Sequence, residues 1–141
     1  MGPDMATEPA LALQQAIQSR LAADSGVTGL LGGARIHDDV PPGAVLPYVT
    51  YGEAVAGDWG TASEDGREHR VTLHAWSRHG GRLEACRIIA AIDVALTDAP
   101  LVLADHHLVN LHYEFSETRR DPDGETFHGL VRYRAVTEPA A

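Results

Sequence analysis

Histidine is the residue type in this chain best suited to chemistry, since eight histidines occur in 141 residues. Neutral imidazole binds metal ions and titrates near neutral pH, so a cluster would indicate a metal site or a general base. No two histidines have the spacing of a local site on one helix or strand. His74, His112 and His128 could share one sheet face, with Glu114 nearby. A metal or general-base cluster is the minor alternative, and ordinary polar surface is favoured.

The remaining reactive residues favour structural roles. Cys86 is the single cysteine and lies in a helical pattern, which favours a small buried thiol over a nucleophile. No further ligands follow Asp38 and Asp39, so a turn is favoured there over a metal site. The chain has no nucleophile elbow, phosphate-binding glycine loop or dinucleotide fingerprint. The sequence therefore predicts no enzyme, no catalytic residue, no cofactor and no metal ligand.

The stretch 68–96 predicts the elements that carry these residues. Its first half alternates in polarity, as a strand does, with Arg70, Thr72, His74 and Trp76 on the polar face. The apolar face carries Val71, Leu73 and Ala75. After Gly80 and Gly81, apolar residues recur at helical spacing, at Ala85, Ile88, Ile89, Ile92 and Leu96. A one-sided strand followed by a one-sided helix predicts a sheet covered by helices.

The preceding residues predict a helix and a strand. Residues 1–8 are expected to be a disordered tail. A helix is expected from Pro9 to about Gly26, with one extra turn at 27–31. Residues 35–37 are compatible with a short strand. The first clear strand is 48–53, which Pro47 opens without the loss of a ladder hydrogen bond.

Residues 54–67 are predicted to form a long loop, rich in glycine, small residues and acids. Loops of this length in a compact domain are usually functional or disordered. Trp59 lies in the middle of this segment. Two roles remain open for Trp59: it folds back onto its own domain, or it anchors the loop in a pocket of a partner protein.

The C-terminal third predicts a β-hairpin. Strands are expected at 108–117 and 126–137, joined by a turn in which Pro122 and Gly124 supply the required backbone angles. The first strand is expected to carry Val109, Leu111, Tyr113 and Phe115 on one face. The predicted fold is therefore α+β: a four-stranded, mainly antiparallel sheet with two helices on one face. Residues 9–138 are expected to be a single domain, and 139–141 a frayed end.

The composition limits the partners. The formal charge is −9 and the isoelectric point is near 5.2, which disfavours ordinary binding to nucleic acid. Every strong base is arginine, because the chain contains no lysine. Without a signal segment or an apolar run long enough to span a membrane, the chain is expected in a reducing cytoplasm.

An ordered series of short motifs spans residues 11–138. The series consists of RIHDDVP at 35–41, LPYV at 46–49, DW at 58–59, EH at 68–69, HAWSR at 74–78, DPDG at 121–124 and FHG at 127–129. In its order and spacing, this series resembles the tail-completion or tail-terminator proteins of long-tailed phages. It is most similar to the versions in prophages and gene transfer agents.

The resemblance implies a structural role in a phage-like particle. Proteins of this family form a ring, usually of six copies, at the head-proximal end of the tail tube. The ring ends tube growth, joins the tail to the head connector and leaves a channel through which DNA passes without specific binding. The implied partners are further copies of the chain, the tail tube protein and the head–tail connector protein. The isolated chain is compatible with either a monomer or a ring.

The resemblance also suggests contact residues between copies or with the tube. These are Asp58, Trp59, Arg119, Arg120, Asp121 and Asp123. We hypothesise that the two arginines pair with acids of the adjacent copy. The implied location is the host cytoplasm during assembly and then the particle tail. A non-viral binding module that docks a protein through its polar sheet face is the alternative function.

Overall fold

The architecture combines three helices with one five-stranded sheet. The structure is a computed structural model and describes residues 7–60, 65–78 and 81–140. The elements in chain order are α1 (Pro9–Ala23), α2 (Ser25–Leu31), β1 (Ile36–His37), β2 (Tyr48–Asp58), β3 (Arg67–Ser77), α3 (Arg82–Thr97), β4 (His106–Arg120) and β5 (Phe127–Pro139). The predicted α+β class is confirmed. The count of four strands and two helices was too low, because the extra turn is a separate helix, α2, and residues 36–37 form β1.

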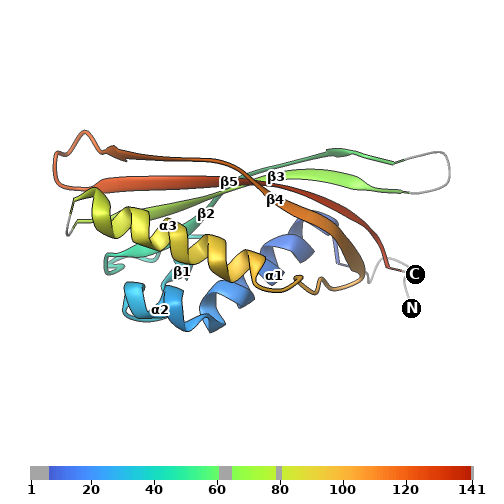
Figure 1. Ribbon diagram of the computed structural model, residues 1–141, viewed down its shortest axis with the longest axis horizontal. Helices are drawn as coiled ribbons and strands as arrows, with labels where there is room; N and C mark the ends of the chain where they lie inside the picture. The colour runs from blue at the N-terminus through green and yellow to red at the C-terminus, as the bar shows by residue number, and fades with distance from the viewer. Residues whose placement is uncertain (1–6, 61–64, 79–80, 141) are drawn as a thin grey trace.

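The sheet is covered by helices on one face only. Its strand order is β1-β2-β3-β5-β4, and every pair except the parallel β1–β2 pair is antiparallel. All three helices lie below the sheet in Figure 1, as the prediction of helices on one face requires. We call the uncovered side the open face.

Alternating side chains divide each central strand between the core and the open face. Val71, Leu73 and Ala75 of β3 are fully buried against the helices, as predicted. The matching core positions of β5 are Val131, Tyr133 and Ala135. The phenol of Tyr133 also donates a hydrogen bond of 2.7 Å to Asp93 of α3. The period of two thus fixes which side chains the helices cover.

The helix ends follow capping rules. Glu8 precedes α1, and its carboxylate accepts hydrogen bonds from the backbone N–H groups of Ala10 and Leu11. Asp24 caps α2 in the same way, and Gly32 ends α2 with a left-handed φ of 78°. Thr7, within the tail predicted to be disordered, donates its N–H to Asp105 at 2.7 Å. Residues 1–6 and Ala141 lie outside the described residues.

The long loop predicted at 54–67 was wrong at both of its ends. β2 continues to Asp58, β3 begins at Arg67, and the two strands pair from Ala54 to Asp58 in a projecting hairpin (Figure 1). The alternation was hidden because glycine and alanine carry no clear polar or apolar signal. The positions are exposed, so backbone pairing rather than burial forms this part of the strand. Residues 61–64 lie outside the described part of the chain.

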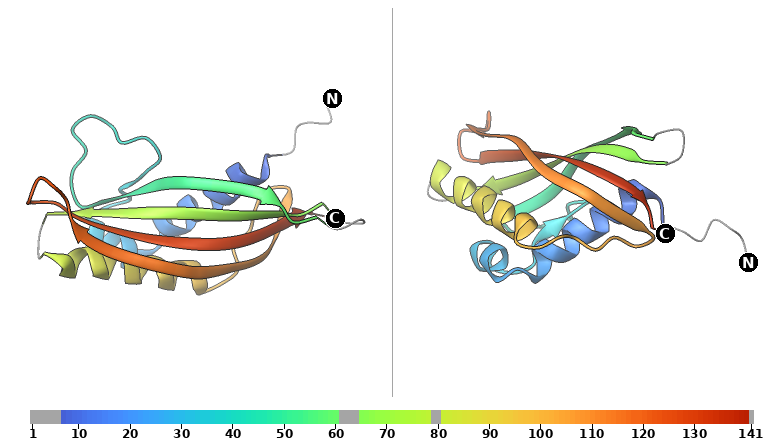
Figure 2. Two further views of the ribbon diagram at one scale, coloured as in Figure 1. Left: turned by 90° about the horizontal axis from the view of Figure 1, so that it is seen from above. Right: turned by 45° about the vertical axis from the view of Figure 1, so that its right-hand side comes forward.

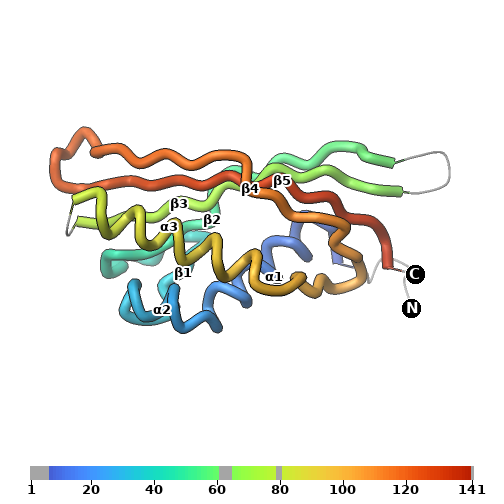
Figure 3. The backbone as a smooth tube through the Cα atoms, in the orientation of Figure 1, coloured from blue at the N-terminus to red at the C-terminus, as the bar shows by residue number. Residues whose placement is uncertain are grey.

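Two further predictions were wrong for local reasons. The register of β4 shifts between Tyr113 and Phe115, and the strand bends (Figure 3). The extra residue turns Phe115 to the open face, opposite Arg132, so Phe115 does not share a face with Tyr113 as predicted. Cys86 is exposed rather than buried, beside Thr118 at 3.6 Å, because it lies at the edge of the apolar stripe of α3.

Candidate functional site

The open face brings two of the three candidate histidines together. His74 of β3 and His128 of β5 lie one strand apart, and Nδ1 of His74 is 2.5 Å from Nε2 of His128. One ring must donate the shared proton and the other accept it. His112 lies opposite Arg134 and does not join them. Glu114 contacts Arg70 at 3.4 Å rather than a histidine. The structure therefore contains a histidine pair, not a triad.

Trp76 holds this pair in place. Its indole stacks on the His128 ring with centroids 4.0 Å apart and planes 3° apart. The indole N–H donates to Thr50 Oγ1 at 3.1 Å. Gly52 lies beneath His74, where any β-carbon would overlap the imidazole ring. Stacking, the hydrogen bond of the indole and the absence of a side chain at Gly52 together set the position of the three rings.

A cavity of about 680 Å³ opens beside the stacked rings. Its lining includes the carboxylates of Asp38, Asp39 and Glu53 and one arginine, Arg119. Oε1 of Glu53 lies 3.4 Å from Nε2 of His74. The remaining lining residues are Val40, Tyr48, Thr50, Tyr51, Gly52, His74, Trp76 and His128. The cavity is therefore acidic and aromatic.

The histidine environments disfavour a positive charge. Burial, and then the neighbouring His74, lower the pKa of His128. Burial also lowers the pKa of His69, which bonds Thr137 Oγ1 at 2.8 Å on the core side of the sheet. Both rings are therefore neutral at pH 7.

Charged side chains form a network farther along the open face. Glu68 accepts hydrogen bonds from Arg70 at 2.8 Å and from Arg134 at 2.7 Å. These two contacts lower the pKa of Glu68. The guanidinium of Arg134 lies 4.9 Å from the centre of the Trp59 ring. Trp59 therefore folds back onto its own sheet, the first of its two open roles, while about half of it remains exposed.

The predicted contact residues fall at opposite ends of the sheet. Asp58 and Trp59 belong to the β2–β3 hairpin, whereas the arginines and the other two aspartates lie at the β4–β5 turn (Figure 1). The structure does not bring the two groups together.

The predicted contact residues of the β4–β5 turn form ion pairs, ring contacts and hydrogen bonds within their own chain. Arg119 pairs with Glu117 at 3.1 Å, and the guanidinium of Arg120 lies 5.1 Å from the centre of the Phe127 ring. Asp121 donates its N–H to the carbonyl of Thr126. Asp123 accepts three hydrogen bonds from Glu125 and Thr126, which lower its pKa to about 2.

The residues that complete the cavity were not predicted from the sequence. Tyr48 and Glu53 belong to β2, and the Asp38–Asp39 pair was interpreted only as a turn. The available signal was the parity of Tyr48, Thr50, His74, Trp76 and His128 on adjacent strands. It could not be used without the strand order, because β3 pairs with β5 rather than with its neighbour in sequence, β4.

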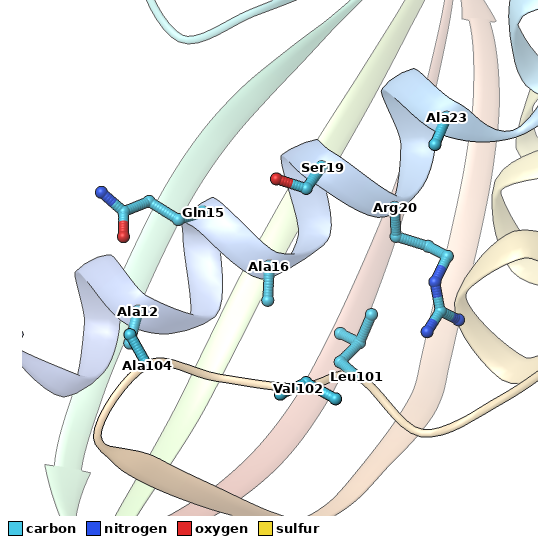
Figure 4. A pocket seen from close by; sticks show the side chains of 9 residues that line it. All are labelled: Ala12, Gln15, Ala16, Ser19, Arg20, Ala23, Leu101, Val102 and Ala104. Carbon is cyan, nitrogen blue, oxygen red and sulfur yellow. The ribbon is translucent and has the colours of Figure 1, made fainter.

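The described part of the chain shows no metal site beside this cluster, and its other hollows differ from the cavity in their lining. The described residues contain no group of three or more His, Cys, Asp or Glu side chains that could hold a metal ion. Another hollow, of about 440 Å³, lies between α1 and residues 101–104 (Figure 4). Arg20 is the single titratable residue in its lining, and its guanidinium donates to the carbonyls of Ala95, Ala99 and Pro100. That hollow therefore offers no reactive group.

A family model described as tail completion protein gp17 matches residues 15–138. The chain belongs to this family. The assignment agrees with the resemblance seen in the ordered motifs. Comparison with curated proteins gave no match. Among the described residues, none of the three helices has the length and apolarity needed to span a bilayer.

Two solved structures resemble this tail completion protein. A chain in the virion of a native gene transfer agent particle is 30% identical, with a TM-score of 0.84. The match covers 92% of this chain and 96% of that one. The gp17 protein of bacteriophage SPP1 is 23% identical, with a TM-score of 0.62, over 96% and 95% of the two chains. The SPP1 likeness supports the fold alone.

The neutral histidines predict a loss of stability in mild acid. The pKa values of His69 and His128 in the folded chain lie below the ordinary value of 6.5, so the unfolded chain binds protons first as pH falls. Their contribution to stability is complete above about pH 7.5 and is lost as pH falls through the folded pKa values. Urea unfolding at pH 7.5 and 5.5 measures this loss.

His69→Gln is expected to reduce the acid-induced loss, since its amide can still bond Thr137 but does not titrate. The exposed His107 provides the control, and His107→Gln should lose as much stability as the unmodified chain. Equal losses in all three proteins would show that the buried histidine does not set the pH dependence.

Proposed function

We propose that this protein caps the head-proximal end of the tail tube of a phage-like particle as a ring. The ring ends tube growth and joins the tail to the head connector. The observation that carries this proposal is the likeness to a chain of a gene transfer agent virion, which extends over almost the whole length of both chains. The subunit of the ring is the single domain of residues 9–138, and six copies are proposed from the family resemblance.

The shape of the sheet supports a head-to-tail ring. A closed ring requires two different, complementary surfaces on each copy. The 38–47 segment projects from one edge of the sheet, and β4 and α3 lie at the other edge (Figure 2, left). The fold therefore presents different residues at its two edges, as a heterologous contact needs.

The charge of the chain supports a channel for DNA. At a formal charge of −9, the surface repels a phosphate backbone, so DNA passes without being held. Several arginines of the open face are paired with carboxylates, including Arg70 and Arg134 with Glu68. Such pairing neutralises part of the positive charge on this face. The partners are further copies, the tail tube protein and the head–tail connector protein, first in the host cytoplasm and then in the particle.

Tail length tests this function. Particles made in cells that lack this gene are expected to carry tubes that are overlong and not joined to heads, because nothing ends polymerisation. Negative-stain imaging measures tube length and the fraction of headless tails, and the unmodified gene on a plasmid is the control. Tubes of normal length joined to heads in the deletion strain would contradict the proposal.

The turn arginines provide a test of the contact between copies. Arg119 is exposed, and its ion pair to Glu117 is a surface pair of small energy, so a neighbouring acid could compete for it. Replacing Arg119 and Arg120 with alanine is expected to weaken ring formation, measured as assembly size by light scattering. Arg119→Ala and Arg120→Ala are also made singly, and Arg82→Ala, which removes one exposed positive charge from α3, is the control for each single change. An unchanged assembly size in the double variant would exclude the arginine pairing.

A further inference from the structure

The acidic cavity beside Trp76 lacks a cation to balance it. Asp38, Asp39 and Glu53 line it, and none of them pairs with an arginine in the described part of the chain. Arg119 is the one arginine in the lining, and its guanidinium bonds Glu117 at 3.1 Å. The lining is therefore net negative when the histidines are neutral.

The aromatic groups of the cavity favour a planar organic cation. Tyr48 and Trp76 supply ring surfaces, on which a guanidinium stacks favourably. Tyr51 also contributes to the lining, although its side chain alternates with these open-face groups and belongs to the buried core.

A metal ion fits this cavity less well than a guanidinium. The facing nitrogens of His74 and His128 bond each other at 2.5 Å, and the described residues hold no metal-capable group of three. The spread of carboxylates and rings over about 680 Å³ matches a long, flat side chain.

Arg87 of α3 is the best candidate for such a cation. The chain has no lysine, so a cation from a second copy must be an arginine. Eight of the ten other arginines have an ion-pair, carbonyl or aromatic partner among the described residues. Arg87 is exposed and forms no ion pair among the described residues. Leu83 and Val94 lie on the same side of α3, 55% and 65% exposed. An exposed apolar stripe around one arginine is typical of an interface.

The two surfaces lie where neighbouring copies in a ring would meet. The cavity is bordered by the 38–47 segment at the β1–β2 edge, and α3 lies under β4 at the opposite edge (Figure 2, left). Side-by-side copies related by a ring axis place one edge against the opposite edge of the next.

We infer that Arg87 of each copy enters the cavity lined by Asp38, Asp39 and Trp76 of the next copy. The inference rests on the proposed ring and names the contact that closes it. Leu83 and Val94 then pack against the 38–47 segment of the neighbour, and the guanidinium forms ion pairs with the aspartates.

A charge exchange tests this contact. Asp39→Arg and Arg87→Asp are made singly and together, and the proteins are added to purified tail tubes from cells that lack the gene. The measurement is the concentration that caps half of the tube ends in negative-stain images. Each single change is expected to raise this concentration about tenfold or more, since it places like charges together. The double variant should return to within about threefold of the unmodified protein. Asp98→Arg, an exposed control on the far end of α3, should have no effect.

The outcomes separate this inference from the proposed function. If the unmodified protein caps no tube ends, the ring proposal fails and the inference fails with it. If the unmodified protein caps tubes but either single variant caps them equally well, only the inference is wrong. Loss in both single variants without recovery in the double variant also overturns the pairing. Circular dichroism and urea unfolding confirm that the variants are folded.

Discussion

The one-sided burial of the sheet is the constraint on which this structure depends. Every core side chain of the central strands points toward the helices, and the period of two sends its neighbours to the open face. No helix covers that face, so its polar and aromatic side chains hydrogen-bond, pair and stack with one another. The Glu68 network and the stack of His74, Trp76 and His128 are two solutions to this requirement. The open face is therefore ordered and polar at once.

This order has a consequence for assembly. A surface whose side chains are already held by stacking and ion pairs loses little conformational entropy when a partner binds. The acidic cavity is part of that surface, because its wall is formed by the same rings. A rigid face with different groups at its two edges suits a subunit that must meet identical neighbours in one orientation.

The sequence predicted what local periodicity encodes and failed where pairing between strands decides. Val71, Leu73 and Ala75 were assigned to the core, and the turn at Pro122 and Gly124 was placed, because both signals are local. The hairpin of β2 and β3 beyond Ala54 was not predicted, because its small residues show no alternation between polar and apolar side chains. The bulge that turns Phe115 outward leaves no mark in the sequence. The cavity required the β3–β5 pairing, which joins segments about 50 residues apart.

The chain belongs to the tail completion family and resembles a chain of a gene transfer agent virion. Its fold is therefore that of a particle protein. We propose that one ring of this chain closes the head-proximal end of the tail through contacts between opposite sheet edges. A cryo-electron microscopy reconstruction of intact particles tests it most directly. One ring is expected at that position, with the sheet edges of adjacent copies in contact. Density for this chain elsewhere in the particle, or copies that meet through other surfaces, would contradict it.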